Sequence, residues 1–344
     1  MEMTPNHLTT TVSKEQGPGY LRLMRMAMGF RESKILLVAN DLNLFSQISE
    51  GCRSIEALAL RLPANIRVLR ILMDALVAMG ILHKVDNSYY NHEIADKYLV
   101  KSKPEYRGDF LAFTHYCWSQ WNDLDAVVKS GRAISKTHGI NQSERAVGNA
   151  YSWGMDNMAK AKAERIAKIL DLSGVRRMLD FGGGAATYSI AFAQRNSQLT
   201  AYVMDLPLSI EVARENIKRN EMEGRVKVLQ GSYWEADYGN NYDLIWVSQI
   251  IHQHSESEVA HLIGKATFAL RSGGRLIVHD SLLTEDRTSP YFAALFSIYL
   301  LTLTEKGRCY TVNETKEWLI QAGLKEVIRI EIDAESDIIM GVKP

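Results

Sequence analysis

The chain has 344 residues, of which 46% are hydrophobic and 23% are charged, and its 40 basic residues are balanced by 40 acidic ones. This length exceeds what a single hydrophobic core usually organises, so we expect two domains. The composition is that of an ordinary soluble globular protein. The balanced charge argues against a protein that binds nucleic acid through a basic surface.

We expect neither a secretory leader nor a membrane span in this sequence. Residues 1–16 are polar and lack the apolar stretch of a secretory signal. The longest apolar run, residues 291–303, is shorter than the roughly 20 residues that span a bilayer, so we expect a buried helix there and a cytoplasmic protein. The three cysteines, Cys52, Cys117 and Cys309, lie far apart without a CxxC pair, which argues against a disulfide framework or a zinc cluster.

The first part of the chain, residues 20–99, has the pattern of short helices. Ser54 is a candidate N-cap, and residues 67–79 form an amphipathic segment that stops at Gly80. Residues 81–90 are typical of a hairpin, so the element order is that of a winged helix. Acidic residues nearly match basic ones here, which favours a packing or dimerisation domain. A DNA-binding regulator is the alternative from another functional class.

We place the N-terminal domain at residues 1–104 and a second domain at residues 105–344. Within the second domain, residues 105–170 are predicted to be helical and are rich in aromatic side chains. Such side chains most often pack in a core, but this segment directly precedes a nucleotide-binding domain, so some can line a site for a flat substrate. The candidate substrate-binding residues are Trp121, Met155 and Met158.

From residue 177 onward, short apolar strands alternate with helices, which indicates a doubly wound, Rossmann-like α/β domain with a mostly parallel sheet. The predicted strands are residues 178–181, 200–204, 226–229, 244–247 and 275–279. The predicted helices are residues 187–195, 208–220, 256–270 and 313–322.

A glycine turn follows the first of these strands, in the segment LDFGGG at residues 179–184. A strand, a glycine turn and a helix let the backbone approach a ligand near the positive end of the helix. Thr187 replaces the third glycine of the dinucleotide fingerprint, which argues against a dehydrogenase. Asp205 ends the next strand and can accept hydrogen bonds from both hydroxyls of a ribose, or alternatively cap the helix that begins near Leu208.

The sequence resembles the plant-type and antibiotic-tailoring small-molecule O-methyltransferases, a family that includes caffeate, acetylserotonin and aromatic-polyketide methyltransferases. The matching stretches are LDFGGG at 179–184, MDLP at 204–207, GSYW at 231–234, IIHQHS at 250–255, RSGGR at 271–275 and IVHD at 277–280. The winged helix also resembles the family's dimerisation domain, so the resemblance covers nearly the whole chain. It implies S-adenosylmethionine as the cofactor, a homodimer, and methylation of an aromatic hydroxyl on a polyketide- or phenylpropanoid-like natural product.

Carried over residue by residue, the resemblance assigns Gly182 to the methionyl part of the cofactor and Asp205 to its ribose. Ser232 and Tyr233 stand at the adenine position, where the family usually has an aspartate in place of Ser232. Ser248 stands where many plant members have a lysine. The candidate cofactor-binding residues are Asp180, Gly182, Gly183, Gly184, Asp205, Leu206, Ser232, Tyr233 and Ser248.

His252 aligns with the family's catalytic histidine and is the candidate general base, because an imidazole can accept a proton from an aligned phenol at neutral pH. From the residues alone, a histidine without a role is the alternative. By the resemblance, Asp280 matches the first of two acids that orient this histidine, whereas Cys309 stands at the second. The Asp–Trp pair that commonly follows the histidine is here Gln253 and His254.

These departures leave open an enzyme with the same fold and cofactor but hydroxylase, decarboxylase or pericyclase chemistry, and an acceptor that is nitrogen or carbon. Four histidines, His252, His254, His261 and His279, also raise the question of a metal. The first two are two residues apart, which suits one face of a strand but not of a helix, and no carboxylate-rich motif accompanies them. We therefore expect no functional metal.

Overall fold

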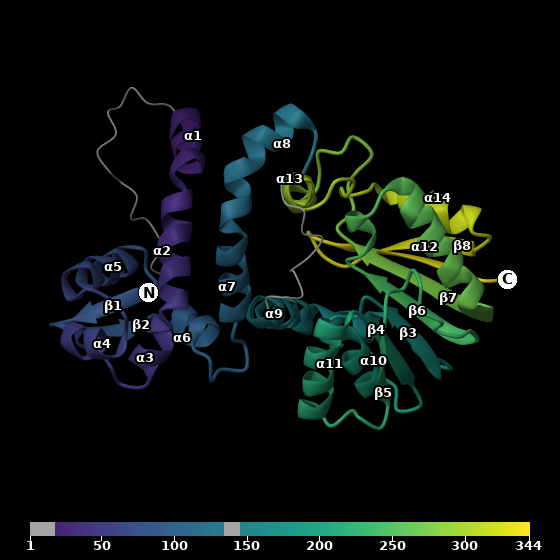
Figure 1. The fold of residues 1–344 in the computed structure, drawn as a ribbon, viewed down its shortest axis with the longest axis horizontal. Helices are drawn as coiled ribbons and strands as arrows, with labels where there is room; N and C mark the ends of the chain where they lie inside the picture. The colour runs from purple at the N-terminus through teal and green to yellow at the C-terminus, as the bar shows by residue number, and fades with distance from the viewer. Residues whose placement is uncertain (1–17, 134–144) are drawn as a thin grey trace. The chain divides into compact units, whose positions relative to one another are not determined.

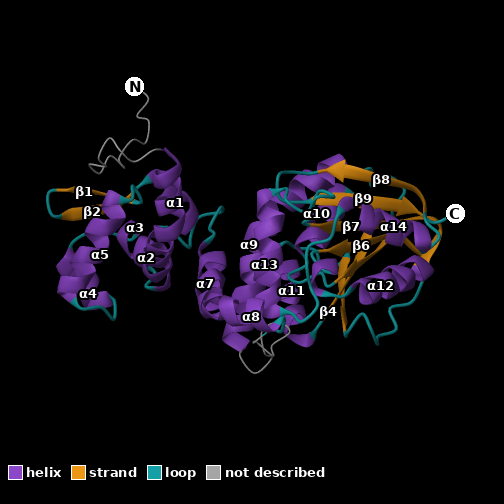
Figure 2. Ribbon diagram, turned by 90° about the horizontal axis from the view of Figure 1, so that it is seen from above, coloured by secondary structure: helices purple, strands orange, loops and turns teal. Residues whose placement is uncertain are grey.

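The structure is a computed structural model that describes residues 18–133 and 145–344, without the side chains of residues 145–150. The polar segment 1–16 thus lies outside the described residues. The chain divides into two compact units, Met1–Gly108 and Asp109–Pro344. Figure 2 shows that the described strands form one hairpin in the first unit and one large sheet in the second. None of the described helices is long and apolar enough to cross a membrane.

The first unit is a group of short helices with a hairpin, as the sequence pattern predicts. Ser54 caps α4, since its hydroxyl accepts a hydrogen bond from the Ala57 amide at 3.2 Å. Leu69, Met73 and Leu76 of α5 are buried against the other helices. The elements are α1 (Pro18–Met28), α2 (Phe30–Asp41), α3 (Leu44–Ser49), α4 (Ile55–Arg61), α5 (Ile66–Ala78), β1 (Leu82–Val85), β2 (Ser88–Asn91) and α6 (Glu93–Leu99).

Helix α1 has no buried residue, although its sequence carries an apolar side. Tyr20, Leu23 and Met26 are 45%, 62% and 67% exposed. A contiguous apolar helix face that a chain leaves uncovered is typical of an interaction surface.

The second unit is built on a seven-stranded sheet with the order β5-β4-β3-β6-β7-β9-β8. The strands are β3 (Arg177–Phe181), β4 (Thr200–Asp205), β5 (Val226–Gln230), β6 (Tyr242–Ser248), β7 (Leu270–Asp280), β8 (Lys325–Glu331) and β9 (Asp337–Val342). The first five pair in parallel, whereas β9 is antiparallel to both β7 and β8. The predicted mostly parallel α/β fold is confirmed, and the two antiparallel strands at the end of the chain are an addition to it.

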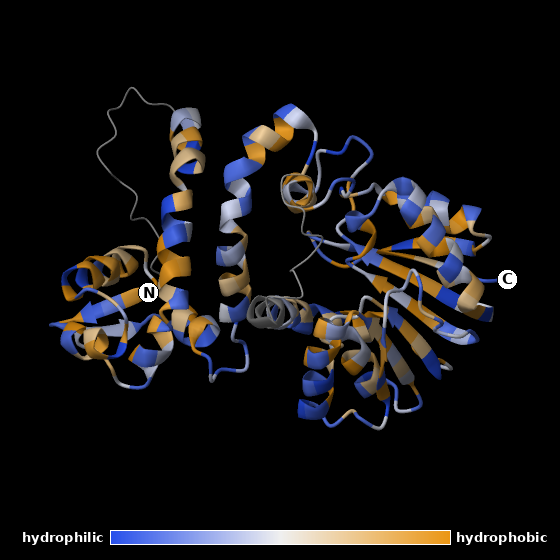
Figure 3. Cartoon of the chain, viewed as in Figure 1, coloured by the Kyte–Doolittle hydropathy of each residue, from blue (hydrophilic) through white to orange (hydrophobic). Residues whose placement is uncertain are grey.

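Helices cover both faces of this sheet (Figure 1). Leu179 and Phe181 of β3 pack with α12 and α14 on one face, while Met178 packs with α9 and α10 on the other. The apolar character of the strands that makes this burial favourable is visible in Figure 3. The helices are α7 (Gly108–Tyr116), η1 (Cys117–Asp123), α8 (Leu124–Ser130), α9 (Arg145–Ile169), α10 (Thr187–Arg195), α11 (Pro207–Arg219), η2 (Ile251–Gln253), α12 (Glu256–Ala269), α13 (Tyr291–Leu303) and α14 (Val312–Gln321).

The apolar run near the end of the chain forms the expected helix, α13, but the expectation that it is buried is wrong for most of its length. Only Ala293, Leu300 and Thr302 are buried, whereas Tyr291 is 73% exposed and Leu295 is 46% exposed. A helix that is apolar on every side gives no sequence signal for which side will pack.

Candidate active site at the carboxyl edge of the sheet

A glycine turn joins β3 to α10. Gly182 and Gly184 have φ angles of 62° and 53°, in the left-handed region that glycine adopts without steric cost. A Cβ atom on Gly182 would lie 2.3 Å from Ile250 Cδ1, and one on Gly183 would lie 2.7 Å from Val203 Cγ1. The neighbouring Ile250 and Val203 side chains therefore leave no room for a side chain at positions 182 and 183. At position 184 the left-handed backbone favours glycine.

Asp205, at the end of β4, holds this turn. One carboxylate oxygen accepts the Gly184 amide at 2.8 Å, and the other accepts the Leu206 amide at 2.7 Å. Burial raises the pKa of Asp205 despite these bonds. The carboxylate does not cap α11, because Leu206 is the N-cap of that helix and no side chain caps it. The Ser209 hydroxyl also binds this carboxylate, so of about four acceptor sites on its two oxygens one remains open to a further hydroxyl.

Asp180 lies beneath the turn and is 1% exposed. Its Oδ2 accepts a hydrogen bond from the Ser189 hydroxyl at 2.7 Å, which ties β3 to α10. Burial raises the pKa of Asp180 to about 7, and the neighbouring Asp205 adds to the shift.

Tyr233 and Ser232 follow β5 and approach the same turn. The Tyr233 hydroxyl and His254 Nε2 share a hydrogen bond of 2.7 Å, and burial raises the pKa of that hydroxyl. Ser232 Oγ accepts the Trp234 amide at 3.2 Å. The position of a Cβ on Gly182 lies 3.9 Å from Tyr233 Cε1, so the Tyr233 ring borders the turn.

Ser248, the last residue of β6, is bound to a buried histidine. Its hydroxyl shares a 2.8 Å hydrogen bond with His279 Nδ1, and His279 Nε2 lies 3.0 Å from Ser336 Oγ. Burial lowers the pKa of His279 to about 3, so this imidazole is neutral and holds Ser248 without adding charge.

A second histidine, His252, forms a buried pair with a carboxylate. His252 lies in η2 after β6, and Asp280 ends the neighbouring strand β7. Their Nδ1 and Oδ1 atoms are 2.6 Å apart, and the same Oδ1 accepts the Ser281 amide at 2.7 Å. The side chains are only 6% and 1% exposed. A carboxylate that holds Nδ1–H leaves the imidazole's Nε2 as the basic nitrogen.

Cys309 lies beside this pair and is 1% exposed. Burial raises the pKa of its thiol to about 12, so the thiol is protonated at neutral pH and cannot act as a second carboxylate for His252. Its amide donates to Ser297 Oγ of α13 at 3.1 Å.

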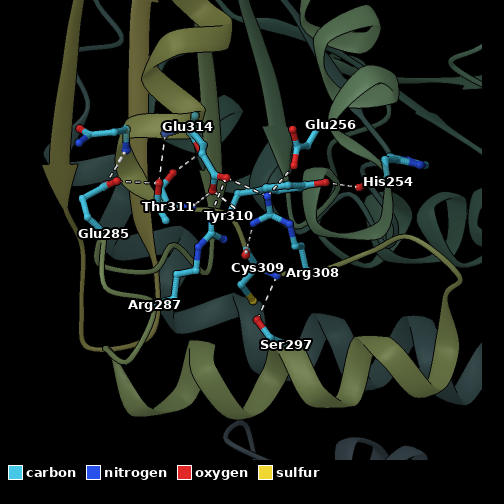
Figure 4. A network of polar contacts seen from close by, with 12 residues as sticks. His254, Glu256, Glu285, Arg287, Ser297, Arg308, Cys309, Tyr310, Thr311 and Glu314 are labelled. Atoms are coloured by element: carbon cyan, nitrogen blue, oxygen red, sulfur yellow. Dashed lines mark hydrogen bonds and ion pairs between the residues drawn. The ribbon is translucent and has the colours of Figure 1, made fainter. Parts of the chain in front are cut away.

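The segment that carries Cys309 is held by the network in Figure 4. Arg308 forms ion pairs of 2.8 Å with both Glu256 and Glu314 and lies 4.3 Å from the centre of the Tyr310 ring. The Tyr310 hydroxyl in turn donates to the carbonyl of His254. The starts of α12 and α14 are thereby tied to the loop that follows His252.

A line of aromatic rings extends from His252 to one of the predicted substrate residues. Phe296 makes an edge contact with His252 at 4.9 Å between ring centres, Tyr299 stacks on Phe296 at 6.1 Å, and Trp121 stacks on Tyr299 at 5.7 Å. Sequence reasoning did not select Phe296 or Tyr299, although their spacing of three residues in α13 places them on one helix side.

The other two predicted substrate residues lie on α9. Met155 is half-buried and Met158 is 39% exposed. Between them, Asp156 binds Thr187 Oγ1 at 2.6 Å and Asn216 Nδ2 at 3.0 Å, so this part of α9 is fixed beside the start of α10.

Within residues 18–133 and 145–344, no group of three or more histidine, cysteine, aspartate or glutamate side chains is arranged to hold a metal ion.

Comparison with known proteins places these features in a family. The O-methyltransferase domain matches residues 121–325, and the O-methyltransferase dimerisation domain matches residues 24–101. A 3-hydroxy-5-methyl-1-naphthoate 3-O-methyltransferase of Streptomyces sahachiroi is 29% identical over 327 residues, covering 93% of this chain and 94% of that protein. Acetylserotonin O-methyltransferase of Bos taurus is 26% identical and covers 91% of this chain and 94% of its own. The crystal structure of human N-acetylserotonin methyltransferase in complex with SAM has a TM-score of 0.86 at 22% identity, covering 96% of this chain and 99% of that one.

The buried Asp180 carboxyl should make the free energy of unfolding depend on pH. The pKa of Asp180 rises from 3.8 to about 7 on folding, so the folded state retains a proton that the unfolded state releases. The free energy of unfolding should therefore fall as pH rises from about 4 to about 7. Asp180→Asn, which keeps the acceptor for Ser189 and cannot ionise, should remove this fall, on the order of 4 kcal/mol across the window.

Tryptophan fluorescence during denaturant unfolding measures this effect in the second unit alone, because all six tryptophans lie in that unit. The difference in the free energy of unfolding between variant and wild type should grow from about pH 4 to about pH 7 and level off above that. Asp125→Asn on the surface of α8 is the matched control. If the difference in the free energy of unfolding between Asp180→Asn and wild type does not change with pH, the Asp180 carboxyl is charged in the folded protein.

Proposed function

The chain belongs to the family of S-adenosylmethionine-dependent O-methyltransferases of aromatic natural products that carry a dimerisation domain, and we propose that it methylates a hydroxyl of a polyketide-like aromatic compound with His252 as the general base. The buried pair of His252 and Asp280 is the observation that carries this proposal. It follows the ends of two adjacent strands at the same edge of the sheet as the glycine turn.

The residues at this edge fit the cofactor. The absence of side chains on the turn lets the methionyl part approach Gly182. Asp205 has an acceptor site left for a ribose hydroxyl, and the Ser209 hydroxyl can give way to a second one. Ser232 and Tyr233 border the position of the adenine. When bound, S-adenosylmethionine supplies an electrophilic methyl group on a sulfonium sulfur.

His252 removes the proton of the acceptor hydroxyl as the oxygen attacks the methyl carbon in line with the departing sulfur. The hydroxyl proton goes to Nε2, the new bond is carbon to oxygen, and the carbon–sulfur bond breaks. Asp280 holds the ring and stabilises the resulting imidazolium through its hydrogen bond to Nδ1 at 2.6 Å. Positioning of the two reacting groups supplies the rest of the acceleration.

The aromatic surroundings favour a flat acceptor. The rings of Phe296, Tyr299 and Trp121 lead away from His252, and aromatic faces suit stacking on a planar substrate. The Streptomyces relative is named for the 3-hydroxyl of a naphthoate, which supports a polyketide-like ring system over a phenylpropanoid. Met155 and Met158 are the candidates for the other side of the substrate.

We also propose that the protein is a homodimer. Its dimerisation domain spans residues 24–101, and α1 presents Tyr20, Leu23 and Met26 without covering them. Burial of apolar surface of this kind is the main favourable contribution to association.

The role of His252 is tested by assaying methyl transfer from S-adenosylmethionine to a panel of hydroxylated naphthoates, with product detected by mass spectrometry as a gain of one methyl group. His252→Ala should lower the rate by about 10²-fold or more while affinity for the cofactor stays near wild type. The residual rate should recover toward pH 10, roughly where a phenol ionises without a base.

His83→Ala, which removes an exposed histidine of β1 in the first unit, is the control and should retain the full rate. A loss of less than about tenfold in His252→Ala, with an unchanged pH profile, would show that proximity alone drives the reaction and that His252 is not the base. No methylated product from any hydroxylated aromatic compound would contradict the proposed reaction itself.

The dimer is tested by light scattering of the full chain at micromolar concentration. Wild type should have twice the mass of one chain, and Leu23→Asp combined with Met26→Asp should shift it toward the monomer, because two charges would be buried in the apolar contact. Val85→Asp, at an exposed position of the hairpin, should remain dimeric. A monomeric wild-type protein would rule out the homodimer.

A further inference from the structure

We propose that His254 is a positioning residue of the cofactor site: through its hydrogen bond to Tyr233, it fixes the Tyr233 ring beside the glycine turn. This inference rests on the proposed function, because it takes the turn to be the place where S-adenosylmethionine binds. The contact of 2.7 Å between the Tyr233 hydroxyl and His254 Nε2 is its starting point.

The bond joins two loops that are far apart in the order of the sheet. Tyr233 follows β5 and His254 follows β6, and β4 and β3 lie between those strands. The connection therefore passes the ends of the two strands that carry Asp205 and the glycine turn.

Both loops contact the turn at one residue. A Cβ on Gly182 would lie 2.3 Å from Ile250 Cδ1 on the β6 side and 3.9 Å from Tyr233 Cε1 on the β5 side. Gly182 thus lies between the two loops, and the bond from Tyr233 to His254 sets how closely they approach each other there.

The main chain on the Tyr233 side is already fixed. Lys265 Nζ donates to the carbonyls of Tyr233 and Trp234 at 3.0 Å and 2.7 Å. Trp234 packs edge-on against His254 and stacks on His261, at 5.1 Å and 6.0 Å between ring centres. The Tyr233 ring itself packs on Phe181 and Trp234, at 6.1 Å and 5.1 Å between ring centres. Such apolar contacts are not directional, whereas the hydroxyl bond to His254 fixes the position of the end of the ring.

The histidine side is fixed as well. The Tyr310 hydroxyl donates to the His254 carbonyl, and Tyr310 packs under Arg308, which is paired with Glu256 and Glu314 (Figure 4). His254 can therefore act as a rigid anchor for the ring that it holds.

A fixed ring matters here because this site lacks a carboxylate at position 232. Ser232 cannot form a charge-assisted hydrogen bond to an adenine amino group, and its hydroxyl already accepts the Trp234 amide. Contact with the Tyr233 ring then contributes more of the cofactor affinity, and a ring ordered before binding loses less freedom when the ligand arrives.

Calorimetry with S-adenosylhomocysteine tests the inference in a double-mutant cycle. Tyr233→Phe and His254→Phe should each weaken the affinity by about three- to tenfold, the usual effect of one hydrogen bond. The double variant should be no weaker than the weaker single variant, because both remove the same interaction. His254→Gln, which restores an acceptor near the Nε2 position, should recover most of the affinity.

Two control variants lie in the same neighbourhood. Tyr238→Phe removes a hydroxyl from a ring that packs on Phe181, and His261→Phe keeps the stack on Trp234. Both should bind like wild type.

The outcomes separate this inference from the proposed function. If wild type fails to bind S-adenosylhomocysteine, both are overturned. If wild type binds and the two single variants bind equally well, or their effects add, the positioning role is overturned and the methyltransferase assignment stands. If His254→Phe does not fold, Tyr233→Phe decides, because it keeps the ring and an unchanged affinity would overturn the role.

Discussion

The hydrogen bond from the Gly184 amide to the Asp205 carboxylate is the interaction on which the site depends. Parallel pairing of β3 with β4 places Phe181 beside Met204, so both strands end at the same edge. The turn that follows reaches Asp205 with a left-handed backbone at two of its three glycines. Once the turn is closed in this way, its outer surface is free of side chains while Ile250 and Tyr233 pack against its first glycine.

Buried polar groups around this edge are largely neutral or paired. Burial keeps His279 uncharged, keeps the Cys309 thiol protonated and raises the pKa of Asp180 to about 7. His252 and Asp280 instead share a short hydrogen bond. Because an unpaired buried charge is costly, a hydrogen-bonded partner is what a buried carboxylate at this edge requires. Cys309, at the position where the resemblance expects a second acid, adds no further buried charge, because its thiol stays protonated.

Much of this architecture could be predicted from the sequence because local signals agree. The glycine turn, the acid at the end of the next strand and the alternation of strands with helices all indicate the same fold, and Asp205 and His252 lie at its carboxyl edge as expected. The final strands β8 and β9 were missed, because their exposed and buried residues do not follow one regular pattern.

Other features depend on packing between distant segments and carry no local signal. The exposure of α13 could not be predicted because the helix is apolar on all sides. The bonds from Tyr233 to His254 and from Ser248 to His279 link residues 21 and 31 positions apart, and only the folded sheet shows that they meet.

The central claim, that the glycine turn and Asp205 form a nucleoside site, is tested most directly by calorimetry of S-adenosylhomocysteine with wild type, Asp205→Asn and Asp205→Ala. Loss of charge-assisted hydrogen bonds to two ribose hydroxyls should weaken binding by about 10- to 100-fold in Asp205→Ala, with a smaller loss in Asp205→Asn, which keeps one acceptor. Wild type should show no binding of NAD. An affinity that is the same in wild type and in a folded Asp205→Ala protein would contradict the claim.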